Sequence, residues 1–502
     1  MQAPKSVQSG EGLQAWLRLD FYSAIVHRSR ELLQYQGAGC PSFRRNPRPW
    51  FLLILKKILI ISPHFPPLNA PDMQRIRMSL PYYRANGWEP VVLTLEEKYQ
   101  DGVREPELLA TLPPDVRIVR IPAIPVRAAR WCGLGNTGLR MLPYLLWHGS
   151  RLLRKEKFDL VFFSNTQFVT FPLGRLWRRW FGVPYVIDIQ DPWRTDYYER
   201  SDSRSPPGGW KYQFARLQAW LLEGWTYRRV GAVMSVSPSY LDDLRLRYPS
   251  FARVPAEVIR FGGSREDLAH AASDPLARSL FDRAHGEIHL LYTGASGPVM
   301  PHSLSVLFDG LRRYRERRQA AAARLRFHFV GTSYVAPGAG IPSVLPVAED
   351  CGVGDLVEEI PHRIGHLEAL RWQLQADALL LPGSSDLAYS PSKLYPYFLS
   401  GRPILGLVFR DSVMERLLDE LNCAHMVRFA DTEPKEQAYA DLAAFFDLAL
   451  AGFPPASQPA RNEELFNRTF LAEGLTRRQC GLFDRLVPPG KTGSAPPDAA
   501  AI

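Results

Sequence analysis

The stretch that decides the fold is DALLLPGSSDLAYSPSKLYPYFLSGRPILGLV, residues 377–408. It begins with an apolar run at 377–382 and closes with a second run at 403–408, and both predict buried strands. Between them, a polar loop leads to a helical segment at 391–400 that stops at Gly401. Two apolar strands joined by a helix predict one parallel βαβ unit.

The same alternation of strand and helix extends from this unit in both directions, beginning near residue 57. The strand-like runs are apolar throughout rather than alternating, as expected for a parallel sheet covered on both faces by helices. We expect strands at 57–62, 89–94, 116–121, 159–164, 184–189, 231–237, 257–261, 288–294, 325–331, 356–360 and 425–429. We expect further helices at 73–86, 138–155, 168–181, 210–229, 238–247, 302–319, 366–376, 411–421, 434–451 and 461–486.

The alternation pauses around residues 262–286, which contain several Gly, Pro and charged residues. The sequence therefore predicts an α/β protein with two doubly wound domains facing each other across a cleft. The expected parts are a poorly ordered extension at 1–55, a first domain at 56–262, a linker at 263–286, a second domain at 287–455, a closing helix at 456–487 returning to the first domain, and a disordered tail at 488–502.

Composition narrows the class of protein. The 502 residues carry a formal net charge of +10, which favours anionic partners such as nucleotides or phospholipid headgroups. The five cysteines are scattered singly, so we expect neither a disulfide framework nor a zinc site. This use of cysteine favours a protein of the reducing cytoplasm. No apolar run reaches the roughly 18–20 residues that a membrane span needs.

Lys393 is the one basic residue between Trp372 and Gly401. We expect Ser390 to cap the helix, Pro391 to take its first position and Lys393 to lie in its first turn. A cation at the positive end of a helix dipole makes sense if a phosphate is held between them. The alternative is an ordinary solvated lysine.

Asp191 follows the strand at 184–189 and precedes Pro192 and Trp193. A carboxylate there could bind acceptor hydroxyls or support positive charge at an anomeric carbon, or it could only cap its loop. His64 and Arg75 lie around the loop after the first strand, where Arg75 is a candidate for an acceptor phosphate.

Several segments together resemble a known family. SPSKLYPYFLSGRPILGL (390–407), ILIISPHFPP (58–67) and VPYVIDIQDPW (183–193) are similar to motifs of the bacterial retaining glycosyltransferases of family four, which have the GT-B fold. The resemblance covers about residues 57–486. It implies two Rossmann-like domains, transfer from a nucleotide sugar with retention of anomeric configuration, no cofactor and no essential metal.

The resemblance also implies roles for individual residues. Asp191 and Lys393 are the catalytic candidates. The expected donor-binding residues are Gly294, Ser296, Gly297, Gly331, Arg363, Ile364, Ser384, Ser385, Ser390, Ser392, Lys393, Leu394 and Tyr397. The expected acceptor-binding residues are His64, Asn69, Arg75, Asp191 and Trp193.

This chain departs from the family pattern at three places. In the first acceptor loop, Asn69-Ala70-Pro71-Asp72 replaces the glycine pair that is common in the family. No Glu occurs from Asp377 to Ser400, although the family usually has two, and the second aligns with Pro396. The loop at 292–303 lacks the Arg and Lys that often bind the diphosphate. Either Lys393 is the main diphosphate cation, aided by an anion nest of the Gly294–Gly297 amides, or the site is degenerate.

A basic segment at 140–179 holds eight Lys or Arg and two acidic residues, with Trp147, Trp177 and Trp180 in or beside it. Such a face suits an anionic membrane surface, or an ordinary helix with its basic side in water. We see no nucleic-acid-binding motif.

Our interpretation is a cytoplasmic glycosyltransferase at the inner face of the plasma membrane. It would transfer sugar to a lipid-linked or polysaccharide acceptor of the cell envelope. The alternatives are a nucleotide-sugar epimerase, or a degenerate transferase-like subunit that binds a nucleotide sugar or a partner enzyme.

Overall fold

The computed structural model describes residues 55–131, 135–194, 210–273, 279–296, 300–333, 340–387, 389–431 and 433–487. The predicted N-terminal extension up to Ile54 and the predicted tail after Val487 lie outside the described residues.

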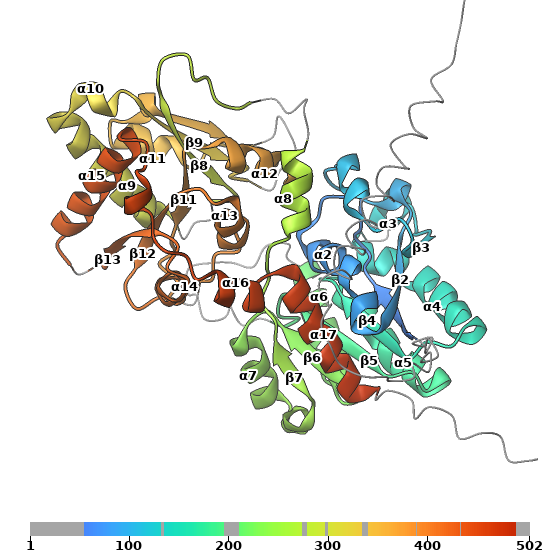
Figure 1. Ribbon diagram of the computed structural model, residues 1–502. Coiled ribbons are helices and arrows are strands. Elements are labelled where there is room, and N and C mark those ends of the chain that lie inside the picture. Colours follow the sequence, from blue (N-terminus) through green and yellow to red (C-terminus); the bar gives the residue numbers. More distant parts are fainter. Residues whose placement is uncertain are drawn as a thin grey trace, which may run out of the picture. The chain divides into compact units, whose positions relative to one another are not determined.

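The first sheet has seven parallel strands in the order β3-β2-β1-β4-β5-β6-β7 (Figure 1). The strands are β1 (Lys56–Ile61), β2 (Trp88–Leu95), β3 (Arg117–Ile121), β4 (Leu160–Ser164), β5 (Tyr185–Ile189), β6 (Ala232–Ser235) and β7 (Ala256–Val258). In the centre, Ile60 is paired with Val92 on β2 and Phe162 on β4. All three side chains are fully buried, which explains why the strand sequences are apolar throughout.

Helices connect these strands: α2 (Gln74–Ser79), α3 (Val126–Trp131), α4 (Thr137–Lys155), α5 (Pro172–Phe181), α6 (Trp210–Tyr227) and α7 (Pro238–Arg247). The helix expected at 73–86 is broken into α2 and short 3₁₀ turns, because Pro81 has no backbone N–H to continue the helical ladder. The segment ends as expected at Gly87, which is left-handed with φ 83°.

The second sheet has six parallel strands in the order β10-β9-β8-β11-β12-β13. They are β8 (Ile288–Thr293), β9 (Leu325–Val330), β10 (Val357–Ile360), β11 (Ala378–Pro382), β12 (Ile404–Phe409) and β13 (His425–Phe429). The connecting helices are α9 (Pro301–Arg317), α10 (Gln319–Ala322), α11 (Leu345–Asp350), α12 (His366–Gln375), α13 (Leu394–Ser400), α14 (Val413–Leu421) and α15 (Glu436–Leu450).

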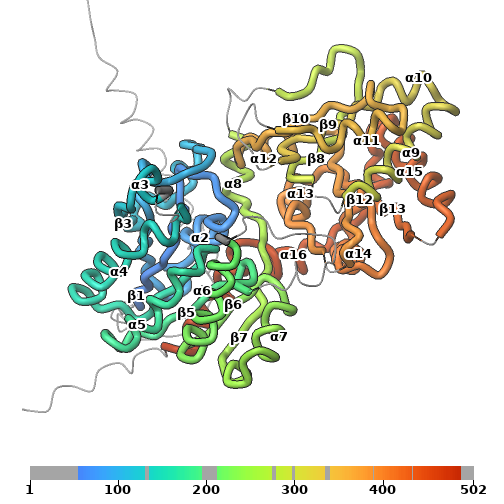
Figure 2. The backbone as a smooth tube through the Cα atoms, turned by 180° about the vertical axis from the view of Figure 1, so that it is seen from behind, coloured from blue at the N-terminus to red at the C-terminus, as the bar shows by residue number. Residues whose placement is uncertain are grey.

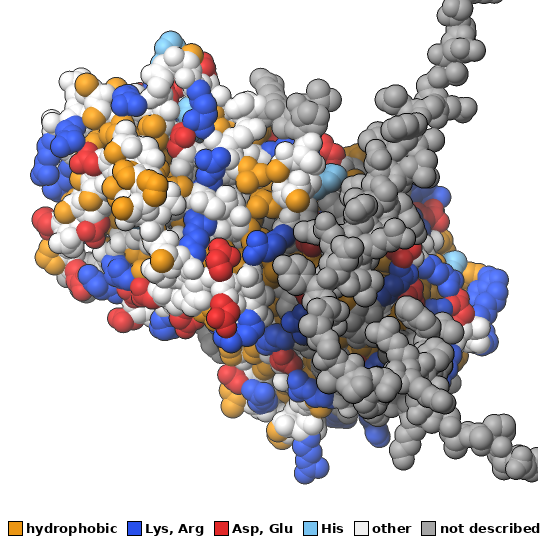
Figure 3. Space-filling view, viewed as in Figure 1, with side chains coloured by type: hydrophobic (Ala, Val, Ile, Leu, Met, Phe, Trp, Pro, Cys, Tyr) orange, Lys and Arg blue, Asp and Glu red, His pale blue; other side chains and the backbone are white. Residues whose placement is uncertain are grey.

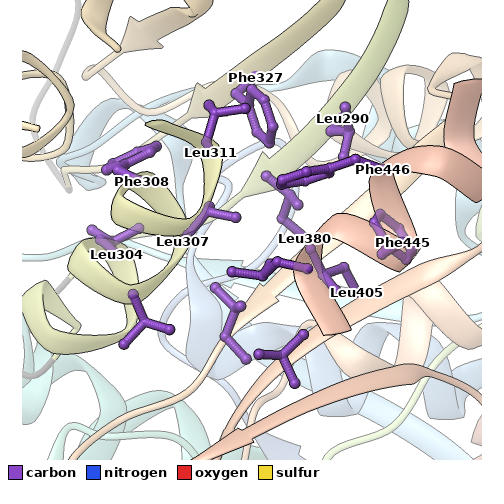
Figure 4. Close-up of a cluster of buried hydrophobic side chains, with 14 of the residues drawn as sticks. Leu290, Leu304, Leu307, Phe308, Leu311, Phe327, Leu380, Leu405, Phe445 and Phe446 are labelled. Atoms are coloured by element: carbon purple, nitrogen blue, oxygen red, sulfur yellow. The ribbon is translucent and has the colours of Figure 1, made fainter. Parts of the chain in front are cut away.

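One hydrophobic cluster of the second sheet shows how its core is built (Figure 4). Leu304, Leu307, Phe308 and Leu311 project from α9, and Phe445 and Phe446 project from α15. They meet Leu290, Phe327, Leu380 and Leu405 of four strands that are neighbours in the sheet. A separate cluster on the other side of this sheet holds α12, α13 and α14, so both faces are covered.

The segment expected to be a linker contains a helix, α8 (Arg265–Ala272). Ser264 caps it by accepting a hydrogen bond from the Asp267 N–H at 3.1 Å, and Ala271 is buried. The charges that suggested a linker belong in part to this capped helix.

The expected C-terminal helix is two helices, α16 (Glu463–Thr469) and α17 (Ala472–Leu486). Between them the chain bonds to Gly263, which donates to the Phe470 carbonyl at 3.0 Å and accepts from the Ala472 N–H at 2.9 Å. α17 then packs on α2 and on β6 of the first domain (Figure 1).

Candidate functional site

The candidate residues gather at the carboxyl ends of parallel strands, where open α/β sheets bind their ligands. In the first sheet they follow β1 and β5. In the second sheet they follow β8, β9, β10 and β11.

Lys393 is the N-cap residue of α13, one position before the first turn in which we expected it. Ser390 is therefore not the cap, and the expected cap at Ser390 with Pro391 at the first position is wrong. Burial raises the pKa of the Tyr395 phenol, and the nearby Ser390 hydroxyl partly offsets this effect.

The Lys393 side chain lies directly over the end of β8. An added Cβ at Gly294 would come within 2.6 Å of Lys393 Cε, so the absence of a side chain at Gly294 makes room for the lysine. Burial lowers the pKa of Lys393, and the positive charge of Arg363 lowers it further. Within the described part of the chain, the Lys393 ammonium has no hydrogen bond or ion pair. Two cations thus converge where an anion would relieve their repulsion.

The expected anion nest of the Gly294–Gly297 amides is not available in this form. The Gly294 N–H donates to the Val330 carbonyl at 2.8 Å, and the Ser296 N–H donates to the Thr332 carbonyl at 2.9 Å. These bonds continue the pairing of β8 with β9, so both amides are already used. Gly297 lies outside the described residues.

Several expected donor-binding residues are buried beneath the site instead of lining it. Leu394 and Tyr397 are fully buried, and the Tyr397 hydroxyl accepts a hydrogen bond from the Thr293 N–H at 2.9 Å. The buried Ser384 hydroxyl accepts from the Asp386 N–H at 3.0 Å. These three residues hold the strand ends and loops in position. Because they are buried, the direct contact with a donor that we expected of them does not fit the structure.

The remaining donor candidates keep some exposure. Ser385 and Ser392 are exposed, and Ile364 is partly buried. Gly331 ends β9 in the left-handed conformation, with φ 73°.

Arg363 and Asn69 join the two sheets' loops. The Arg363 guanidinium donates to Asn69 Oδ1 at 2.9 Å, and Asn69 Nδ2 donates to Glu105 at 2.9 Å. Glu105 also accepts from the N–H groups of His366 and Leu367, at 2.6 and 2.7 Å, at the start of α12. Asn69 is buried in this network, so the expected contact of Asn69 with an acceptor does not fit its surroundings.

His64 follows β1 and pairs through Nδ1 with Asp72, 2.9 Å from the carboxylate oxygens. Burial alone would lower the pKa of His64, but the hydrogen bond and charge of Asp72 outweigh it, and the pKa is raised. Burial would raise the pKa of Asp72, but the bonds from His64 and Thr166 lower it. The pair is partly buried and holds the ring through Nδ1, which leaves His64 Nε2 without a partner among the described residues.

Asp191 has an exposed side chain after β5, as expected. Partial desolvation and the charge of Asp72 raise its pKa. Burial raises the pKa of Tyr240, and the charges of Asp191 and Asp386, which lie in loops of different sheets, raise it further.

Arg75 and Trp193 are held by neighbours. The buried Arg75 guanidinium pairs with Asp188, Nε to carboxylate 2.8 Å, and donates to the Ile259 carbonyl at 2.7 Å. It is not exposed for the acceptor phosphate that we expected it to bind. Trp193 is partly buried and stacks on Phe168, with ring centroids 5.9 Å apart.

The sequence did not single out Asp72, Glu105, Tyr240 or Asp386. Asp72 lies in the loop where the family's glycine pair is replaced. That replacement was the sequence feature that could have directed attention to Asp72. The contacts of Glu105 and Tyr240 join residues far apart in the chain, which no local pattern reveals.

Among the described residues, no three His, Cys, Asp or Glu side chains gather as metal ligands would. No helix in the described ranges is long and apolar enough to cross a membrane.

Residues 74–262 match the model of the glycosyl transferase 4-like domain family. Among curated proteins, none matches the sequence.

The solved structures with a similar fold include these two. The N-terminal domain of trehalose-6-phosphate phosphatase from Candida albicans gives a TM-score of 0.53 at 11% identity, over 91% of this chain and 99% of that chain. An α,α-trehalose-phosphate synthase (UDP-forming) from Burkholderia xenovorans, in complex with glucose-6-phosphate, gives 0.52 at 10% identity, over 86% and 100%. At these identities the likeness shows the fold alone. With the two parallel sheets, it confirms the expected α/β class with two Rossmann-like domains.

Proposed function

Because residues 74–262 match the glycosyl transferase 4-like domain within a two-sheet fold of the GT-B type, we propose that the chain is a nucleotide-sugar-dependent glycosyltransferase. The second sheet would bind the donor, and the loops of the first sheet would bind the acceptor.

The observation that carries the proposal is the position of Lys393. Its side chain lies over Gly294, and the charge of Arg363 lowers its pKa. Its ammonium has no described partner. Two nearby cations at a strand end suit the diphosphate of a nucleotide sugar. When the diphosphate leaves, they would stabilise its developing charge.

The acceptor side would use exposed or unpartnered groups. His64 Nε2 is free to hydrogen-bond an acceptor hydroxyl, and Asp72 fixes the orientation of the ring. Asp191 would lie near the anomeric carbon and support its positive charge. Retention of configuration, the absence of an essential metal and a lipid-linked or polysaccharide acceptor complete the proposal, and they rest on the family resemblance.

Calorimetric titration with UDP, GDP, CMP and ADP tests donor binding first. One of these nucleotides should bind with clearly higher affinity than the other three. Sugar nucleotides of that base are then incubated with and without lipid-linked and glycan acceptors, and the products are analysed by NMR.

Each alternative has its own outcome in this experiment. Release of the nucleoside diphosphate that depends on the acceptor, together with a product that keeps the anomeric configuration of the donor sugar, supports the proposal. Conversion of the sugar nucleotide without any acceptor indicates an epimerase. Tight binding without turnover indicates a degenerate subunit, and no binding at all contradicts the nucleotide site.

A further inference from the structure

Exposed hydrophobic side chains are concentrated on one part of the first sheet's helical layer. Ten large hydrophobic side chains are exposed in the described part of the chain, and six of them lie on α4, α5 and α6. They are Trp147 (57% exposed), Trp180 (51%), Phe214 (50%), Leu217 (54%), Trp220 (61%) and Leu221 (55%).

The three helices are neighbours on one face of the sheet. α4 packs on α5, and α5 packs on α6. Residues of α4, α5 and the end of α6 belong to the same hydrophobic cluster under this layer, so their outer sides all point away from the same face of the sheet. Figure 2 shows the three helices in succession.

The exposed residues of α6 form a stripe. Phe214, Leu217 and Leu221 are spaced three and four residues apart, so they lie along one side of the helix, with Trp220 beside them. Between α4 and α5, a shallow groove of about 500 Å³ is lined by Trp147, Trp180 and the stems of basic residues. An apolar stripe and interfacial tryptophans on adjacent helices exceed the scattered exposure of an ordinary surface.

The charge of this face is of one sign. The sequences of α4, α5 and α6 contain a single acidic residue, Glu223, which is buried and paired with Arg247. Arg151, Arg154, Arg178 and Arg179 are exposed and form no ion pair within the described ranges.

In the second domain, by contrast, basic residues lie among acidic ones and pair with them. Figure 3 shows blue and red side chains interspersed over its surface. On α9, for example, Arg312 pairs with Glu316 and Arg315 with Asp355.

We propose that the outer face of α4, α5 and α6 is a docking surface for an anionic lipid bilayer. The stripe of α6 enters the interface, Trp147 and Trp180 lie at headgroup level, and the unpaired arginines bind lipid phosphates. The inference deepens the proposed function and rests on it in one respect: it names the surface from which a lipid-linked acceptor would be reached.

One earlier expectation changes. Trp177, counted with the basic Trp-rich face, is fully buried, and its ring lies against Gly149 of α4. Its role is to pack α5 on α4, and it does not reach lipid.

The test is sedimentation of the full chain with vesicles of phosphatidylcholine, with and without phosphatidylglycerol. The wild type should bind the anionic vesicles, more weakly as salt rises. Leu217→Gln combined with Leu221→Gln should weaken partitioning by about tenfold or more. Arg178→Glu with Arg179→Glu should weaken binding to anionic vesicles alone. Ile341→Gln, a change at an 82% exposed residue of the second domain, is the matched control and should bind as the wild type does.

Tryptophan fluorescence with quencher-labelled lipids adds a positional readout. Quenching should fall in Trp220→Phe because an exposed ring of the stripe is removed. It should not fall in Trp88→Phe, because the ring of Trp88 is buried against Phe483 of α17. Equal sedimentation of the wild type and the double-leucine variant would overturn the proposal. A wild-type dimer that the same double variant dissociates, without vesicle binding, would assign the face to a second copy instead. Nucleotide binding, measured separately on each variant, keeps this outcome distinct from a failure of the proposed function.

Discussion

At the scale of single residues, the ion pair of His64 and Asp72 makes stability depend on pH. The folded pKa of His64 is raised, so the stabilising contribution is complete below the unfolded pKa of about 6.5 and is lost as pH rises through the folded pKa. The lowered pKa of Asp72 keeps that carboxylate charged in mildly acidic solution.

We therefore predict that His64→Gln destabilises the protein most at about pH 6, by roughly 1.5–3 kcal/mol, and less above neutral pH. Thermal unfolding of both proteins across this range measures the difference. His285→Gln, at an exposed histidine, is the control and should show no such trend. A difference that grows with pH would contradict the charged pair.

Gly294 is the residue that gives Lys393 its place. Its φ of 150° is unfavourable for other residues, and a Cβ there would meet Lys393 Cε at 2.6 Å. We predict that Gly294→Ala displaces the lysine and weakens nucleotide binding, with a strain of about 1–3 kcal/mol that lowers the melting temperature.

Gly286→Ala separates these two effects. Gly286 is also left-handed, with φ 67°, but a Cβ there would have open space except for the tip of Arg324 at 4.0 Å. This control should lose stability and keep its nucleotide affinity. Unchanged affinity in Gly294→Ala would show that the position of Lys393 does not matter.

At the scale of elements, Glu105 acts as the missing cap of α12. The N-cap residue of that helix, Gly365, has no side chain, and Glu105 accepts the first two N–H groups from a loop far away in sequence. A carboxylate at a helix N-terminus is also favoured by the dipole.

Glu105→Gln should therefore destabilise the chain by about 1.5–3 kcal/mol in urea denaturation and speed hydrogen exchange in the first turn of α12. Glu107→Gln removes a neighbouring pair with Arg371 in which Glu107 is half exposed, and should cost at most about 1 kcal/mol. Equal effects of the two substitutions would rule out the capping role.

The elements themselves were largely predictable. The strands of both sheets fall within a few residues of the apolar runs, because a strand buried on both faces leaves an uninterrupted apolar signature. The start of α13 was not predictable, because Ser390 and Pro391 have the residue types of a helix start, whereas the helix begins only after Lys393. α8 was hidden because its apolar side is short and surrounded by charges.

At the scale of the whole molecule, the two sheets contribute different chemistry to the site. The second brings the cations Lys393 and Arg363, and the first brings His64, Asp72 and Asp191. The sequence predicted which loops carry these residues, because parallel strands place their carboxyl ends together. It could not predict which side chains remain available: Arg75, Asn69 and Tyr397 are used by buried partners that lie 36 or more residues away in the chain.

The most direct test of the account is calorimetry of nucleoside diphosphate binding to wild type, Lys393→Ala and Lys435→Ala. Lys435 is the matched control, because it is likewise the N-cap residue of a helix in the second domain. Loss of a charge-assisted contact of about 1.5–3 kcal/mol should weaken binding to Lys393→Ala by roughly 10- to 150-fold, with little change in Lys435→Ala.

The same titrations in buffers of different ionisation enthalpy add a signature specific to this lysine. The pKa of Lys393 is lowered in the free protein, and a bound diphosphate would raise it, so binding in alkaline solution should take up a proton. Lys393→Ala should abolish that uptake and Lys435→Ala should keep it. Unchanged affinity and unchanged proton uptake in Lys393→Ala, beside a saturable wild-type site, would contradict the account.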